Sequence, residues 1–305
     1  MSSASIAGIG IAPGLAAKVF SSPNPGKVCV FSKCLQFLDY EELGDRIAKI
    51  GFYGADLTVR DKGHVLPQNV KVDLPKAIKA IHKAGVEVPM IVTGINNASL
   101  KLTEDILGTA SDCGIRNYRM GYYKYDNKLP VFKNLDNCKR KIEQLEKINR
   151  KYNIKGGYQN HSGPWGMVGG AVWDLYYILK DFDPEYIGIQ YDIAHATVEG
   201  GYSWALSLKV ISPWINSVAI KDFKWGKGEK RWEPKWCQLG EGMVDYKNYL
   251  KKIALLNSTL PITLHCEYDL GGAELGHINP SMMPKDIFKK LTQDLHYFNN
   301  ILLKS

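Results

Sequence analysis

From Lys27 onward, hydrophobic and polar positions follow two alternating patterns. Short runs of β-branched and other apolar residues are each followed by a longer stretch in which apolar residues recur at helical spacing. The first pattern is typical of buried strands, and the second of helices that bury one face. The predicted strands are 27–33, 54–60, 86–95, 115–123, 154–161, 186–193, 215–223 and 261–269. The predicted helices are 39–51, 73–85, 102–114, 134–153, 169–182, 203–212, 245–257 and 285–304.

This regular alternation predicts a parallel sheet, because parallel strands need a crossover connection and a helix usually supplies it. Eight strand–helix units in a chain of 305 residues favour one closed (β/α)₈ barrel, the TIM-barrel fold, over an open sheet. No G-x-G-x-x-G or G-x-x-x-x-G-K-[ST] motif follows a predicted strand, which argues against a nucleotide-binding α/β fold. The predicted barrel domain spans residues 27–305.

Residues 1–26 lie outside this pattern. The segment is small and apolar, contains Leu15, Ala16 and Ala17, and then becomes polar and proline-rich. It resembles the later part of an export signal without its basic front. A loosely docked N-terminal segment fits equally well. Two localisations therefore stay open, export to the periplasm and the cytoplasm.

The amino-acid composition of the chain limits the kinds of partner that it can bind. The chain is 45% hydrophobic and 23% charged, as globular domains are, and it has no apolar run of the roughly 18 residues that a membrane span needs. The net charge of +8 comes mainly from lysines spread along the chain, which indicates a solvated basic surface more than a nucleic-acid site. We expect a small-molecule partner, no nucleic acid and no membrane; homo-oligomerisation stays open.

The segment IQYDIAH (189–195) is unusual because an apolar strand ends on Asp192, with His195 three residues later. A buried carboxylate is costly unless it is paired or binds a cation. In a parallel barrel the carboxyl ends of all strands meet at one rim, where TIM-barrel chemistry is found. The polar residues at or just after the predicted strand ends are Lys33, Arg60, His64, Arg119, Gln159, Asn160, His161, Asp192, His195, Lys221, Asp222, His265, Glu267 and Asp269. We expect Asp192 and His195 to face one polar cup together with Gln159, His161, His265 and Glu267.

Each of these residues also has a purely structural interpretation. His265 could be a satisfied core histidine, Asp192 a helix N-cap, and Glu267 the ion-pair partner of Lys221. His64 could be a simple loop residue, and Arg119 could form a salt bridge inside the barrel. These alternatives remain open at the level of sequence.

Five segments carry a family resemblance: GADLTVR, GYQNHSG, YDIAH, VAIKDF and HCEYD. Through their order and spacing, residues 27–304 resemble the sugar phosphate isomerase/epimerase family of xylose isomerase-like barrels, whose fold endonuclease IV shares. The resemblance implies a divalent ion held by Glu, Asp, His and Glu at the ends of strands five to eight. Asp192 and Glu267 match the Asp and the last Glu, and His195 matches a histidine that contacts substrate.

Two positions depart from that pattern, because Gln159 stands where the first Glu is expected and Ala219 where the His is expected. Three explanations follow. A weaker Mn, Zn or Mg site could use Gln159, Asp192, Glu267 and His265 or His161. Alternatively, the Lys221 ammonium could replace the cation. The third explanation is a barrel that binds carbohydrate without catalysis.

The main hypothesis is a sugar isomerase or epimerase that works through an enediolate. Glu267 would remove a proton α to a carbonyl, Lys221 or a metal would stabilise the enediolate, and His161 or His195 would move a hydroxyl proton. The predicted substrate-binding residues are Arg60, His64, Arg119, Trp165 and Trp225. Arg60, Arg119 and Lys33 would bind a phosphate if the substrate carries one.

Two alternatives stand beside this hypothesis. One is a non-catalytic carbohydrate-binding barrel, since a fold alone does not fix a function. The other is an endonuclease IV-like DNA repair enzyme. The second is disfavoured because the seven histidines do not form the ligand set of a multi-zinc cluster.

Overall fold

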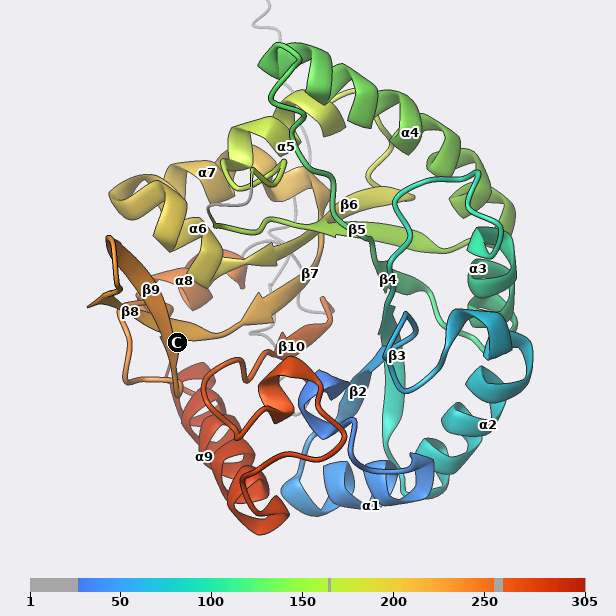
Figure 1. Cartoon of the computed structure of the whole chain (residues 1–305), viewed down its shortest axis with the longest axis vertical. Coiled ribbons are helices and arrows are strands. Elements are labelled where there is room, and N and C mark those ends of the chain that lie inside the picture. The colour runs from blue at the N-terminus through green and yellow to red at the C-terminus, as the bar shows by residue number, and fades with distance from the viewer. Residues whose placement is uncertain (1–26, 164–165, 255–259, 305) are drawn as a thin grey trace, which may run out of the picture.

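The computed structural model describes residues 27–163, 166–254 and 260–304. Eight parallel strands close into a barrel in the order β1-β10-β7-β6-β5-β4-β3-β2 (Figure 1). They are β1 (Val28–Phe31), β2 (Gly54–Thr58), β3 (Glu87–Val92), β4 (Asn117–Arg119), β5 (Lys155–Gln159), β6 (Ile187–Asp192), β7 (Ile215–Ile220) and β10 (Ile262–Leu264). The predicted single (β/α)₈ barrel is confirmed. The N-terminal segment 1–26 lies outside the described residues.

Helices surround the barrel, as the ring of coiled ribbons in Figure 1 shows. They are α1 (Tyr40–Ile50), α2 (Val70–Lys83), α3 (Thr103–Asp112), α4 (Val131–Tyr152), α5 (Val172–Leu179), α6 (Ile193–Gly200), α7 (Trp204–Ile211), α8 (Tyr246–Ile253) and α9 (Pro284–Leu302). The stripe of α4 that spacing predicts is buried at Leu135, Cys138, Ile142 and Leu145 and half-buried at Ile148. Within the described residues, no helix combines the length and apolar character that crossing a bilayer requires.

Local sequence signals account for the ends of the elements. At the start of α1, the Asp39 side chain accepts from the backbone N–H of Glu42, and the Glu42 side chain accepts from the backbone N–H of Asp39. This reciprocal capping box satisfies two amides that a helix start leaves unpaired. The helix ends at Gly51, whose φ of 100° is a left-handed conformation that glycine adopts without strain.

Two elements differ from the prediction. The helix α6 begins directly at the end of β6 with Asp192 as its N-cap, whereas the sequence pattern predicts the next helix only at 203–212. After β7, the chain does not enter a loop but forms an antiparallel hairpin of β8 (Asp222–Lys227) and β9 (Trp232–Cys237). The alternation of Trp with Lys in these two segments was the available strand signal.

Asp222 fixes the base of this hairpin. Its carboxylate accepts from four backbone N–H groups, those of Phe223, Gly240, Gly242 and Val244, at 2.9–3.2 Å. Asp222 is 1% exposed, so these hydrogen bonds take the place of the water that would otherwise solvate its charge. The hairpin is therefore anchored at the residue that follows Lys221.

Glycines in β5 and β6 let the strands approach neighbouring groups. A Cβ on Gly188 would lie 2.3 Å from the backbone oxygen of Trp214, and a Cβ on Gly157 would lie 2.6 Å from Asn216 Oδ1. Backbone cannot move away from such a contact as a flexible side chain can. Glycine is therefore required at position 188 because a side chain would not fit there, and not because of its backbone dihedral angles.

We predict that Gly188→Ala lowers the free energy of unfolding by about 2–4 kcal/mol, because strand β6 must shift to relieve the clash. The matched control is Gly94→Ala, where nothing lies within 4 Å of the added carbon, and its effect should stay below about 1 kcal/mol. Urea denaturation of both variants measures the difference. Equal stabilities of the two variants would contradict this account of β6.

Candidate active site

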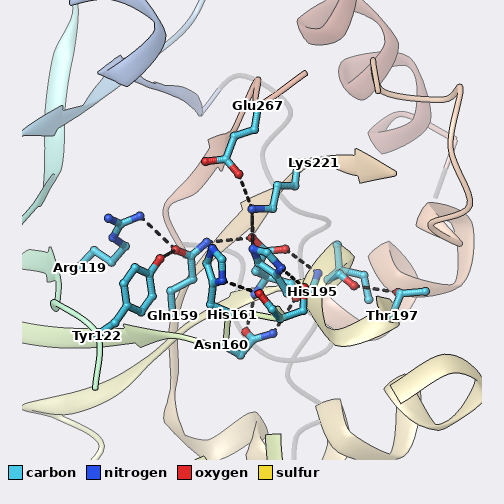
Figure 2. Close-up of polar contacts among 12 residues, drawn as sticks. Arg119, Tyr122, Gln159, Asn160, His161, His195, Thr197, Lys221 and Glu267 are labelled. Atoms are coloured by element: carbon cyan, nitrogen blue, oxygen red, sulfur yellow. Dashed lines mark hydrogen bonds and ion pairs between the residues drawn. The ribbon is translucent and has the colours of Figure 1, made fainter. Parts of the chain in front are cut away.

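A buried lysine lies at the centre of the polar rim. The Nζ atom of Lys221, directly after β7, is 2.6 Å from Glu267 Oε2, 2.7 Å from His195 Nε2 and 3.3 Å from Asp192 Oδ2. Lys221 is 2% exposed. Figure 2 shows its side chain directed into the cluster formed by residues after β5, β6 and β10. The structure thus brings together four of the residues that the sequence places at strand ends.

The charge of Lys221 is maintained by its two carboxylate neighbours. Burial alone would lower the pKa of the ammonium group, but Asp192 and Glu267 outweigh burial and raise it. The lysine therefore stays protonated near neutral pH. Such a group can polarise a carbonyl or stabilise an oxyanion, whereas it is a poor nucleophile and a poor base.

Glu267 is held by two lysines. Lys221 contacts Oε2 at 2.6 Å, and Lys33 contacts Oε1 at 2.8 Å. Burial would raise the pKa of this carboxyl, but the two ammonium groups lower it well below its ordinary value. Its side chain remains 18% exposed, so a ligand can reach it. As long as both lysines stay in contact, Glu267 is a weaker base than a free glutamate.

The buried carboxylate of Asp192, at the end of β6, is compensated by several partners. Asp192 is fully buried, and its carboxylate is paired with Lys221, accepts from Gln159 Nε2 at 2.8 Å and caps α6 through the backbone N–H of His195. Asn160 exchanges two further hydrogen bonds with the Asp192 backbone. Burial raises the pKa of Asp192, and Lys221 opposes that rise. The N-cap role and the contact with Lys221 therefore coexist in one residue.

Gln159 is oriented by neighbours on its other side. Its Oε1 accepts from Arg119 Nη1 at 3.1 Å and from the hydroxyl of Tyr122 at 2.5 Å, as the dashed lines of Figure 2 show. Its amide N–H group consequently faces Asp192. The oxygen of Gln159 is directed away from the pair of carboxylates.

Two histidines lie against each other beside Lys221, with ring centroids 3.9 Å apart. His195 Nε2 accepts from the Lys221 ammonium, so Nδ1 carries the proton and donates to Ser162 Oγ at 2.7 Å. Burial and Lys221 hold the pKa of His195 well below its ordinary value, and the same causes lower the pKa of His161 to about 4. His161 Nδ1 donates to the Ser162 carbonyl, which leaves Nε2 as an acceptor.

Further positive groups surround the ring of Phe31. The guanidinium carbons of Arg60 and Arg119 lie 5.6 and 5.3 Å from its centroid, and Lys33 Nζ lies 5.4 Å away. The Arg60 side chain makes no hydrogen bond or ion pair within the described part of the chain. Burial and the neighbouring Arg119 lower the pKa of Arg60 to about 10. Its donors are available to a bound ligand.

Three predicted residues lie apart from the Lys221 contacts. His265 stacks on Phe31 at 4.5 Å, and neither ring nitrogen has a hydrogen-bond partner among described residues. His64 is held by Ser32, Thr58 and the Leu35 carbonyl. This structural role is close to the alternative that His64 is a simple loop residue. Trp225 lies on β8, where its ring makes an edge contact with the ring of Phe223. Trp165 falls outside the described residues.

Tyr122 and Ser162 belong to the site although the sequence pattern gave neither a role, and Trp236 also lies in it. Tyr122 and Ser162 hold Gln159 and His195, and the Trp236 ring lies 4.6 Å from Lys221 Nζ. Tyr122 and Ser162 follow strands β4 and β5 within a few residues, so their positions near strand ends were the available signal. The contact of Trp236 with Lys221 depends on the β8–β9 hairpin, which the sequence pattern did not predict.

The resemblance implies a divalent metal, and the donor set can be tested against it. Lys221 Nζ occupies the space between Asp192 and Glu267, and the Gln159 oxygen accepts from Arg119 and Tyr122. The predicted ligands Gln159, Asp192, Glu267 and His265 therefore do not fit a metal ion in this arrangement. Across residues 27–163, 166–254 and 260–304, no group of three or more His, Cys, Asp or Glu is placed so that it could hold a metal ion.

Residues 45–282 match the sequence family described as xylose isomerase-like TIM barrel. This chain belongs to that family. Among curated proteins, MJ1311 of Methanocaldococcus jannaschii, an uncharacterized protein, is 22% identical over 224 residues, which cover 68% of this chain and 73% of that protein.

Solved structures share the xylose isomerase-like fold with this chain. D-psicose 3-epimerase of Clostridium cellulolyticum H10, solved with D-tagatose, matches at TM-score 0.69 and 11% identity over 90% of this chain and 99% of the other. A xylose isomerase-like protein of Mycobacterium smegmatis, solved with magnesium, matches at TM-score 0.59 and 14% identity over 86% of this chain and 88% of the other. Sugar epimerases recur among these structural neighbours.

Another carboxyl, that of Asp56 on β2, is buried inside this xylose isomerase-like barrel. It is 0% exposed, and Arg119 on β4 and Thr263 on β10 lie near it. Burial raises the pKa of Asp56 to about 7, although Arg119 and Thr263 oppose the rise. The folded protein therefore binds a proton here that the unfolded chain, with an ordinary pKa of 3.8, releases.

We predict that Asp56 makes the protein less stable as pH rises from about 4 to 7, because its folded pKa lies above its unfolded pKa. Asp56→Asn should remove this loss. With these pKa values, the gain of the variant over the parent should be roughly 3 kcal/mol larger at pH 8 than at pH 5. Urea unfolding at both pH values measures the effect, and an equal difference at the two pH values would contradict the prediction.

Proposed function

We propose that this protein is a sugar isomerase or epimerase in which the Lys221 ammonium stabilises an enediolate. The observation that carries the proposal is the buried Lys221, held protonated between Asp192 and Glu267 at the carboxyl rim of the barrel. A fixed positive charge in a site with little water stabilises developing negative charge far better than it would in solution.

The contacts of Lys221 assign separate roles to the two carboxylates. Asp192 is fully buried and also bonded to Gln159 and to the α6 backbone, so it anchors the lysine. Glu267 is partly exposed and comes from a loop beyond β10. Glu267 is thus the carboxylate that a substrate can reach.

Glu267 acts as the base in this proposal. A substrate carbonyl oxygen takes a hydrogen bond from Lys221, which shares the lysine's charge with the substrate and raises the basicity of Glu267. Glu267 then removes the proton from the α carbon, the electron pair of that C–H bond forms a C=C bond to the carbonyl carbon, and the π pair of the C=O bond moves to the oxygen. The resulting enediolate oxygen is stabilised by Lys221.

The second half of the reaction needs a group that moves a hydroxyl proton. The Nε2 atom of His161 can accept one, because Nδ1 donates to the Ser162 carbonyl and Nε2 has no hydrogen-bond partner among the described residues. His195 is less suited to this step, since both of its nitrogens are already bonded. Return of the carbon-bound proton at the neighbouring carbon gives isomerisation, and return at the same carbon from the other face gives epimerisation.

The substrate class is a carbohydrate with a carbonyl group. Arg60, Arg119 and Lys33 offer N–H donors to hydroxyl or anionic groups beside Phe31. Epimerases that act on such sugars have the same fold, which supports the choice of class. The proposal uses no metal-dependent step, since Lys221 takes the place that a cation would need.

We expect the protein to exchange the α proton of a keto-sugar with solvent deuterium, as NMR can follow over a panel of ketopentoses, ketohexoses and keto-glycosides. Lys221→Met should reduce exchange at least about 10³-fold, because the enediolate loses its counter-charge. Glu267→Gln should reduce it at least about 10²-fold, because the amide cannot accept the proton.

The matched control is Lys224→Met, since Lys224 is an exposed lysine three residues further on, in β8. It should exchange at the parent rate. Full exchange in Lys221→Met or Glu267→Gln would remove those residues from the proposed mechanism. A parent protein that binds panel sugars without any exchange would instead favour the non-catalytic carbohydrate-binding alternative.

We also predict that chelation leaves the activity unchanged. Protein dialysed against EDTA should keep the parent rate and contain well under one equivalent of Mn, Zn or Mg by elemental mass spectrometry. The physical reason is that Lys221 already neutralises Asp192 and Glu267. Loss of activity on chelation, reversed by one divalent metal, would overturn the role given to Lys221.

A further inference from the structure

A pocket of about 550 Å³ lies beside the Lys221 cluster, under the β8–β9 hairpin. The hairpin contributes Trp225, Trp232 and Trp236 to its lining, and α6 contributes Glu199. His161, after β5, forms part of the opposite wall. A pocket of this size is in the range that encloses small organic ligands.

The three tryptophans share one face of the hairpin. In the antiparallel register, Phe223 pairs with Trp236, Trp225 with Pro234, and Lys227 with Trp232. Residues that alternate along a strand lie on the same side, as do cross-strand partners, so all three indoles are on one side. Trp225 is 43% exposed and Trp232 is 67% exposed, which leaves their ring faces open to a ligand.

Polar groups in the pocket carry both signs of charge. Glu199 Oε1 accepts from the backbone N–H of Gly163 at 3.1 Å, and its second oxygen has no partner among the described residues. The Arg231 side chain likewise makes no hydrogen bond within the described part of the chain. Mixed charges beside aromatic faces suit a neutral ligand with many hydroxyls better than an anion or a purely apolar group.

Two residues of the pocket lining, Trp236 and His161, contact the proposed reaction centre. The Trp236 ring lies 4.6 Å from Lys221 Nζ and 5.1 Å from the His195 ring. His161 lines the pocket, and its ring lies 3.9 Å from that of His195. A ligand in the pocket would therefore touch the same two side chains, Trp236 and His161, that lie against Lys221 and His195.

We propose that this pocket binds a second sugar ring, linked by a glycosidic bond to the sugar that reaches Lys221. The pyranose C–H face is apolar and slightly positive, so it packs on the electron-rich faces of Trp225 and Trp232. Glu199 and Arg231 hydrogen-bond the ring hydroxyls. The substrate is thus a disaccharide or larger glycoside, an assignment that relies on the proposed function for the sugar at Lys221.

The test measures binding by calorimetry for glucose-, galactose- and mannose-containing disaccharides with α and β linkages, and for their component monosaccharides. We expect at least one disaccharide to bind at least about tenfold more tightly than either component. Trp225→Ala and Trp232→Ala should each abolish this preference while monosaccharide binding is kept. The control is Trp173→Ala, a tryptophan of α5 that is 51% exposed and outside the pocket, which should keep the preference.

A preference below tenfold for every disaccharide, or one that survives in both Trp225→Ala and Trp232→Ala, overturns the second sugar site. The two proposals fail separately. Absence of deuterium exchange with a tryptophan-dependent disaccharide preference would remove the isomerase and leave the second site in place. Deuterium exchange of monosaccharide keto-sugars without any disaccharide preference would remove the second site and leave the isomerase proposal in place.

Discussion

The ammonium group of Lys221 between two carboxylates is the interaction on which the site depends. Removing a charge from water costs several kcal/mol, and only close opposite charges offset that cost. Lys221 has three N–H donors, and its three nearest acceptors are Asp192, Glu267 and His195. Asp192 in turn needs Gln159 and the start of α6, so the cluster links the ends of β5, β6 and β7.

This full set of partners means that a substrate oxygen must replace one of them. Asp192 is fixed by its own buried bonds, and His195 is fixed through Ser162. Glu267, which is partly exposed, is the partner with the most freedom to move. Substrate binding would then release the carboxylate at the moment when it is needed, because the lysine cannot serve both oxygens equally.

Much of this arrangement could be predicted from the sequence. The eight units follow from periodicity, and the polar residues at strand ends follow from the rule that parallel strands end at one rim. Asp192, His195, Lys221 and Glu267 do meet there. Local pattern could not show that Lys221 fills the gap between the carboxylates, because that depends on side-chain direction. The hairpin was missed since its strands are exposed and rich in lysine, unlike the barrel strands.

Four backbone amides donate hydrogen bonds to the Asp222 carboxylate. These bonds separate two functions, reaction and recognition, whose residues are adjacent in the sequence. On one side of Asp222, Lys221 belongs to the rigid barrel; on the other, the hairpin carries its aromatic face. Changes of length or composition near the hairpin tip would be absorbed before they reach the ammonium group. Related proteins could thus diversify what they recognise by remodelling the tip, while the reacting atoms keep their positions.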